Sequence, residues 1–305
     1  MALGKAVMAL HRILVATDFS EAGHAAVARA GQLAAQYHCQ LTVFHATPDW
    51  TLFSQRAAAH QAHYADITRN AEELMRGEVS WLGQQFGLTT VRGEIYRDRA
   101  TLAITRAIES FQPNVLVIGA GGEHIVPGGE TVLGETALKL ISRVSVPLLL
   151  VRNSSPMPYT STLAGMGAEV RVARRLTLWA STLAGSGTCH MVRAYEAPYA
   201  HRMRLCGYGD TELAQSAEEQ RQIAQQDCEV LEHTVQPGTH LVVHIVRGAP
   251  VATVLQQVKL CAPQLVVIGQ HEHYANEHPG AWAAGLGTRI AYHCPTDVLM
   301  VPSAN

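Results

Sequence analysis

The chain has 305 residues and a net charge of −2, so we expect about two domains and no nucleic acid as the main partner, which would require a basic patch. No apolar run reaches the roughly 20 residues that cross a bilayer, so we expect no membrane partner. The opening residues hold too short an apolar stretch for a secretory signal.

Short apolar runs alternate with longer amphipathic segments through the first half of the sequence. The first run ends in Asp18 and Ser20, which predicts a turn and a helix capped near Ser20. Strands without polar alternation that are separated by helices indicate an α/β fold, with a parallel sheet covered on both faces. We predict buried strands at 12–20, 41–46, 91–95, 115–119 and 148–151, and helices at 25–37, 55–86 and 99–111.

The stretch 153–158 contains two prolines and two serines and is the predicted linker, which gives domains at 1–152 and 160–305. The first strand of the second half is the weakest prediction, because Gly165 and Gly167 fall inside it and glycine weakens a strand. The second half repeats the order of the first, with predicted strands at 162–168, 191–195, 240–246, 265–269 and 297–301, and helices at 171–184, 211–235 and 250–261.

The second half also repeats residues of the first. The stretch PNVLVIGAGG at 113–122 returns as PQLVVIGQHE at 263–272, an offset of 150 residues (263 − 113). The same offset pairs Val151 with Val301. A constant offset of half the chain indicates a duplicated domain, since the repeats of a solenoid run only about 20–50 residues.

Cysteine and histidine usage indicates the cellular compartment. Six cysteines are scattered without a Cys-x-x-Cys pair, so we expect reduced thiols in a cytoplasmic protein. The 16 histidines are unusual in number, and most are expected to be solvated imidazoles. The alternative is pH or metal sensing, because histidine titrates near neutrality.

Open parallel sheets bind ligands at the carboxyl ends of their strands, where the strand order reverses. The loops expected there are 16–20 and the glycine-rich 119–134. Glycines let backbone N–H groups approach phosphate, and the Asp18 carboxylate suits a pair of ribose hydroxyls. The loop is neither a P-loop nor a dinucleotide fingerprint, because no Gly-Lys-Ser/Thr follows and His124 replaces the third glycine. The alternative is that these glycines only allow a tight turn.

The order of these motifs resembles the universal stress protein family in its tandem form, with two such domains fused. The resemblance implies two flavodoxin-like, adenine nucleotide alpha hydrolase-like domains, each with five parallel strands in the order 3-2-1-4-5. It also implies dimerisation through the fifth strands, induction by stress and, in most members, no established catalysis. The motifs are Asp18 after the first strand, His45-Ala46 ending the second, Gly-x-x-Gly at 119–122, and Leu133-Gly134 opening the last helix before Pro147 and an apolar strand.

The resemblance also implies a nucleotide site in the first domain. Ala16 and Asp18 match the positions beside base and ribose, and Ala46 the backbone position that recognises adenine. The matches in the two phosphate loops are Gly119, Gly121 and Gly122 in the first, and Gly134, followed by Glu135 and Thr136, in the second.

Two departures from the family pattern weaken the predicted site. The gap between Gly122 and Gly134 is eleven residues, longer than nucleotide-binding members usually have. Glu135 stands where a serine or threonine would meet phosphate, and the segment 119–136 holds no Lys or Arg. Because a carboxylate repels phosphate, we expect weak binding of ATP and a smaller penalty for AMP.

The second half lacks the matching residues, so we expect it not to bind nucleotide. Gly167 or Ala168 replaces Asp18, Glu272 replaces Gly122, and Ala284 replaces Gly134. Its loop 271–278 carries His271, Glu272, His273 and His278, which are weak candidate zinc ligands without the spacing of a structural site. A solvated polar loop is the favoured reading, and we expect no metal cofactor; His60 and His63 are similarly weak candidates.

We therefore expect a non-catalytic stress-response protein whose first domain alone binds adenine nucleotide. The alternatives are a weak nucleotide hydrolase that uses the same site and an interaction scaffold without a ligand. We also expect an internal pseudo-dimer, because the apolar edge strands 148–151 and 298–301 would cover each other. A homodimer stays open, and the protein partners are unknown.

Overall fold

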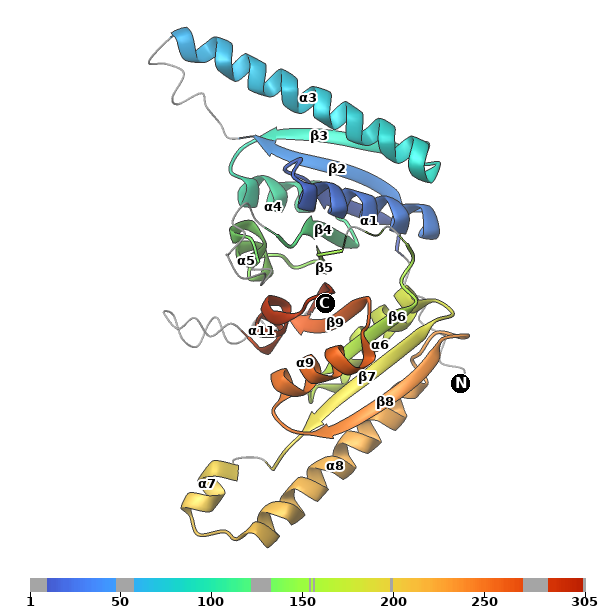
Figure 1. Cartoon of the computed structure of the whole chain (residues 1–305), viewed down its shortest axis with the longest axis vertical. Coiled ribbons are helices and arrows are strands. Elements are labelled where there is room, and N and C mark those ends of the chain that lie inside the picture. Colours follow the sequence, from blue (N-terminus) through green and yellow to red (C-terminus); the bar gives the residue numbers. More distant parts are fainter. Residues whose placement is uncertain are drawn as a thin grey trace. The chain divides into compact units, whose positions relative to one another are not determined.

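The computed structural model describes residues 10–47, 58–121, 133–153, 155, 157–197, 200–270 and 285–303. The chain divides into two compact units, an N-terminal unit Ala9–Pro158 and a C-terminal unit that includes Tyr159–Asn305. Each unit contains a parallel sheet with helices on both faces (Figure 1).

The N-terminal unit has strand order β3-β2-β1-β4-β5, and every neighbouring pair is parallel. Helices α1 and α3 contact each other on one face of the sheet, and α4 and α5 contact each other on the other. This confirms the predicted fold class. The elements are β1 Arg12–Ala16, α1 Glu21–Tyr37, β2 Gln40–Thr47, α3 Ala58–Phe86, β3 Val91–Arg97, α4 Ala100–Phe111, β4 Val115–Gly119, α5 Glu135–Ile141 and β5 Leu148–Val151.

The C-terminal unit repeats this topology, with strand order β8-β7-β6-β9-β10 and parallel neighbours. Helices α6 and α8 contact each other, as do α9 and α11. The short helix α7 was not predicted. The elements are β6 Ser161–Met166, α6 Val170–Ala184, β7 Thr188–Tyr195, α7 Ala200–Leu205, α8 Asp210–Glu232, β8 His240–Arg247, α9 Pro250–Cys261, β9 Leu265–Gln270, α11 Leu286–His293 and β10 Asp297–Pro302.

Strand β6 forms despite the glycine that was expected to weaken it. A Cβ atom added to Gly165 would lie 3.2 Å from a methyl group of Val254 and 3.3 Å from one of Ile268. The glycine therefore sits where α9 and the neighbouring strand β9 pack closely, and the fully buried Leu163 and Ala164 hold the strand in the core.

Strand register aligns the two units residue by residue. Ala16 pairs with Ile118 in the N-terminal unit, and Gly165 pairs with Ile268 in the C-terminal unit. Gly165 is thus the counterpart of Ala16. Counting on by two residues, Gly167 is the counterpart of Asp18, which decides between the two candidates that the sequence left open.

Helix α1 begins where the sequence predicted a cap, although earlier than the predicted residue 25. The Ser20 hydroxyl accepts a hydrogen bond from the Gly23 amide at 3.1 Å. This satisfies one of the donors that a helix start leaves free. The helix ends at His38, whose φ of 54° is left-handed.

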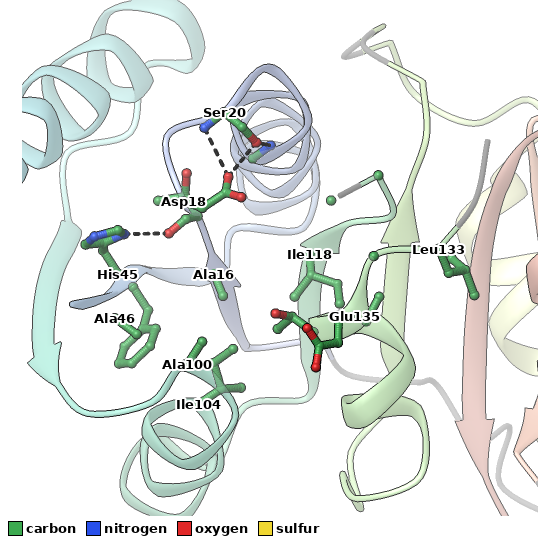
Figure 2. A pocket seen from close by; sticks show the side chains of 18 of the residues that line it. Ala16, Asp18, Ser20, His45, Ala46, Ala100, Ile104, Ile118, Leu133 and Glu135 are labelled. Carbon is green, nitrogen blue, oxygen red and sulfur yellow. Dashed lines mark hydrogen bonds between the residues drawn. The ribbon is translucent and has the colours of Figure 1, made fainter. Parts of the chain in front are cut away.

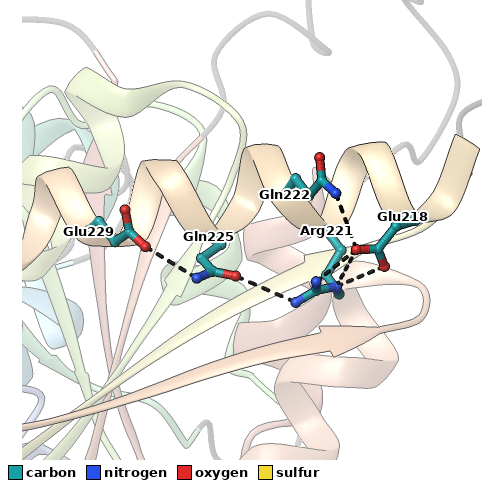
Figure 3. Close-up of polar contacts among 5 residues, drawn as sticks. All are labelled: Glu218, Arg221, Gln222, Gln225 and Glu229. Carbon is teal, nitrogen blue, oxygen red and sulfur yellow. Dashed lines mark hydrogen bonds and ion pairs between the residues drawn. The ribbon is translucent and has the colours of Figure 1, made fainter.

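The long helix α8 buries one stripe and exposes a polar face. Side-chain hydrogen bonds run along that face from Glu218 through Arg221 and Gln225 to Glu229, at the spacing of successive turns (Figure 3). A polar face of this kind is suited to contact with water.

Among the described residues, no helix combines the length and apolar character needed to cross a membrane.

Helices α1 and α3 pack most tightly at Gly31. A Cβ atom there would lie 2.4 Å from a methyl carbon of Leu82 and 2.7 Å from the ring of Phe86. Leu82 is fully buried, so it has little room to move. Gly31 therefore sets the spacing between the two helices.

We expect Gly31→Ala to lower the free energy of unfolding by roughly 1–3 kcal/mol, because overpacking outweighs the better helix propensity of alanine. Urea denaturation measures the change. Gly77→Ala on α3 is the matched control, since nothing lies within 4 Å of a Cβ atom there. It should stabilise by up to about 1 kcal/mol. Equal stabilisation by both substitutions would contradict the packing argument.

Candidate functional site

A pocket of about 520 Å³ opens at the carboxyl ends of β1, β2 and β4 in the N-terminal unit (Figure 2). Its volume is typical of sites for small molecules. Gly122, which was predicted to belong to the site, lies outside the described residues. The pocket brings together all the other predicted nucleotide-binding residues, namely Ala16, Asp18, Ala46, Gly119, Gly121, Gly134, Glu135 and Thr136.

Strand order explains the position of the pocket. Strand β1 lies between β2 and β4. The chain leaves β1 toward α1 on one face of the sheet and leaves β4 toward α5 on the other face. Strand β1 ends at Ala16, which pairs with Phe44, while β2 continues to Thr47. Ala46 therefore lies beyond the end of β1 and lines the pocket.

One wall of the pocket is apolar. Ala16, Ala46 and Ile118 come from the strands, and Ala100 and Ile104 from α4 complete the wall (Figure 2). The sequence did not identify the α4 residues, because the packing of α4 over the strand ends is a tertiary feature. A wall of this kind suits a flat apolar group such as a nucleobase.

The turn after β1 holds Asp18 in an exposed position. Its carboxylate accepts hydrogen bonds from the Ser20 amide at 3.0 Å and from the Ser20 hydroxyl. A Cβ atom at Gly23 would lie 2.6 Å from the carboxylate, so glycine here leaves room for the carboxylate in this position. The turn thus fixes Asp18 while leaving it accessible to a ligand.

His45 supports the same turn, a role that the sequence did not reveal. Its Nδ1–H donates to the Thr17 carbonyl at 2.8 Å, and its ring centroid lies 4.4 Å from that of Phe19. Phe19 has a left-handed φ of 62°, which few residues adopt without support. The His45 contacts help to hold this conformation.

Gly119 allows a close approach between β4 and α1. A Cβ atom there would lie 2.6 Å from the backbone carbonyl oxygen of Ala22, which cannot move aside. At Gly121 the nearest atom would be 3.6 Å away, an ordinary contact. Steric fit alone therefore explains why residue 119 is a glycine, but it does not explain why residue 121 is one.

The two ends of segment 122–132 are held together. Gly121 forms an antiparallel bridge with Leu133, and the Gly134 amide donates to the Ala120 carbonyl at 2.9 Å. Gly134 is also the N-cap of α5. The N–H of Gly134 is thus already used by the contact with Ala120.

Glu135 does not face the pocket as an unpaired charge. Its side chain is 81% exposed and forms an ion pair with Lys139 one turn along α5. The hydrogen bond and the charge of Lys139 both lower the pKa of Glu135. Lys139 lies just beyond the segment 119–136, so the sequence prediction of repulsion between Glu135 and a phosphate did not include this ion pair.

A second acid lies near Asp18, and the sequence did not identify it. Oε1 of Glu78 on α3 lies 3.4 Å from Nδ1 of His24, whose ring is tilted by 54° against that of Trp81 at a centroid distance of 4.6 Å. Burial raises the pKa of Glu78, the hydrogen bond from His24 lowers it, and the charge of Asp18 raises it.

The C-terminal unit differs at the equivalent positions. Gly165 and Gly167 replace Ala16 and Asp18, so the exposed carboxylate is absent there. The predicted loop residues His271, Glu272, His273, His278 and Ala284 lie outside the described residues, as do the side chains of His60 and His63.

Comparison with solved structures shows the same fold over almost the whole chain. The chain is similar to a universal stress protein from Archaeoglobus fulgidus DSM 4304 at 14% identity and a TM-score of 0.66, over 96% of this chain and 98% of that one. A putative universal stress protein from Pseudomonas aeruginosa UCBPP-PA14 gives 15% identity and a TM-score of 0.63, over 96% and 94%. At these identities the likeness shows the fold. No curated protein matches the chain.

Comparison with families gives two matches to one model, described as the Universal stress protein family. They cover residues 9–152 and 171–302. Together they span most of the chain, one match in each unit. The chain therefore belongs to the universal stress protein family and carries two of its domains in tandem.

Proposed function

We propose that the N-terminal unit binds an adenine nucleotide in the pocket at the ends of β1, β2 and β4, and that the chain acts by binding rather than by catalysis. The observation that carries the proposal is the convergence of an apolar wall, an exposed carboxylate and two glycines on one pocket. The C-terminal unit is proposed not to bind nucleotide, because Gly167 takes the place of Asp18.

Each part of a nucleotide has a matching part of the pocket. The base would lie against Ala16, Ala46 and the α4 residues. The ribose hydroxyls would donate to Asp18, whose carboxylate is held by Ser20. The phosphates would lie beside Gly119 and Gly121, where small residues let backbone groups come close.

We favour binding over hydrolysis because each of the two carboxylates among the described pocket residues already has a partner within the chain. Asp18 is bonded to Ser20 and Glu135 is paired with Lys139. Hydrolysis would require a general base within reach of the attacking water. Phosphate release from ATP in a single turnover, lost in an Asp18 variant, would favour the hydrolase. Absence of any co-purified or added ligand would favour the scaffold.

Asp18→Ala is expected to weaken AMP and ATP binding by the full chain about tenfold or more, because hydrogen bonds to a charged group contribute roughly 1.5–3 kcal/mol. Isothermal titration calorimetry measures both affinities. Asp66→Ala is the control, since it removes an exposed carboxylate that pairs with Arg69 away from the pocket. If the two variants bind alike, Asp18 does not contact the ligand.

Glu135→Ser is expected to strengthen ATP binding by up to about tenfold, because it removes a partly screened negative charge and adds a donor. AMP should gain less, since its single phosphate reaches less far. Lys139→Ala should have the opposite effect on ATP, because it leaves Glu135 unpaired. Titrations at fixed salt test both. An unchanged ATP affinity in both variants would mean that the pair points away from the ligand.

We also propose that the two domains of one chain pair through their fifth strands. Strands β5 and β10 are each at the edge of their own unit's order, and both are apolar. Exposed apolar edges promote aggregation.

Light scattering should therefore give a monomer of 33.0 kDa. Amides of β5 and β10, including those facing away from β4 and β9, should exchange slowly with deuterium, because pairing protects them. A stable dimer would assign the pairing to two chains instead. Rapid exchange of the outward amides at either strand would contradict pairing of any kind.

A further inference from the structure

Two histidines and a cysteine meet in the C-terminal unit, away from the positions that match the nucleotide pocket. His190 lies on β7, His244 lies on β8, and Cys261 is the last residue of α9. Strand register pairs His190 with Val242 and Val192 with His244, so the histidines are diagonal neighbours on one face of the sheet. Helix α9 contacts β7 and brings Cys261 to that face.

The three side chains are close enough to share one ion. Nδ1 of His190 lies 3.1 Å from Nε2 of His244, which lies 3.8 Å from Sγ of Cys261, and the three atoms all fall within 4.8 Å of one another. Around a tetrahedral zinc ion, two nitrogens would be roughly 3.4 Å apart, and nitrogen and sulfur roughly 3.6 Å apart. Only small side-chain adjustments separate the two arrangements. Across the described parts of the chain, no other three potential ligands gather this closely.

The alternative is a hydrogen bond between two imidazoles without an ion. Burial lowers the pKa of both histidines, and His244 and His240 lower that of His190 further. Such a bond would account for the two rings. It does not account for the Cys261 thiol, which belongs to a third element, α9, and lies near the same Nε2 atom of His244.

The N-terminal unit lacks this cluster. The counterparts of His190 and His244 by strand register are Thr42 and Glu94, since Phe44 on β2 corresponds to Val192 on β7. The last residue of α4 is Phe111, where α9 ends with Cys261. The cluster is therefore particular to the C-terminal unit.

We propose that His190, His244 and Cys261 bind a zinc ion through Nδ1, Nε2 and Sγ, with the fourth position open to water or another ligand. Two imidazoles and one thiolate match the ligand preference of zinc. The ion would link the end of α9 to β7 and β8. The free energy of unfolding should therefore rise with the logarithm of the zinc concentration.

The test uses the full chain, stripped of metal with a chelator and titrated with Co²⁺ as a spectroscopic substitute. A thiolate-to-cobalt charge-transfer band should appear and saturate at one equivalent, and Zn²⁺ should displace it. Cys261→Ser should remove the band. His244→Gln should weaken Zn²⁺ binding by more than the roughly 10–100-fold that loss of an outer hydrogen-bonding partner costs.

Two control variants separate this cluster from other potential ligands. Cys206→Ser removes an exposed thiol outside the cluster, and the combined His271→Gln, His273→Gln and His278→Gln change removes the histidines of the loop 271–278. Both should keep the band. Loss of the band in either control, or its survival in Cys261→Ser, would overturn the proposal.

A further measurement requires no substitution. Zinc should protect Cys261 from alkylation in the wild-type chain, as read by peptide mass spectrometry, and should raise its melting temperature. If the wild-type chain shows neither a thiolate band nor protection of Cys261, the proposal is wrong, whatever the variants do.

Discussion

The hydrogen bonds of the turn between β1 and α1 determine where the pocket of the N-terminal unit opens. Thr17 donates its amide to β2 and receives a hydrogen bond from His45, while Ser20 both binds Asp18 and caps α1. One short segment thus ends the central strand, starts a helix and positions a carboxylate. The apolar wall and the glycines complete a pocket whose location this turn has already fixed.

The two units illustrate how a duplicated domain can keep its fold while its sites diverge. The buried strands consist of apolar residues in both units, because side chains of another size or polarity would disturb the close packing of the core. Residues at strand ends and on outer strands experience weaker constraints. That difference lets Gly167 stand at the place of Asp18, and lets His190 and His244 stand at the places of Thr42 and Glu94.

The fold could be predicted from the sequence because its strands are uninterrupted apolar runs separated by helical segments, and only a parallel sheet satisfies that pattern. The candidate pocket could be predicted in part, because parallel strands bring Ala16, Ala46 and Gly119 to the same edge of the sheet. Contacts between distant elements could not be predicted.

The missed contacts have two causes, because two of them join distant elements and one lies within a single helix. Ala100 reaches the pocket through helix packing, and Lys139 reaches Glu135 through a helical turn beyond the motif. Cys261 approaches His244 from a different element. The Ala100 and Cys261 contacts depend on distances that strand order alone does not give, whereas the Lys139 contact follows from the i,i+4 spacing within a helix and could have been predicted. The positive φ of Phe19 likewise depends on the His45 contacts rather than on a turn residue.

The bridge between Gly121 and Leu133 has a consequence for how such chains evolve. With both ends of the intervening segment held together, the number of residues between them can change while the pocket edges stay in place. Lengthening a closed loop is inexpensive, since even a doubling costs only about 0.6 kcal/mol. Insertions here are therefore tolerated by the scaffold, and the segment can acquire new sequence without a compensating change in the sheet.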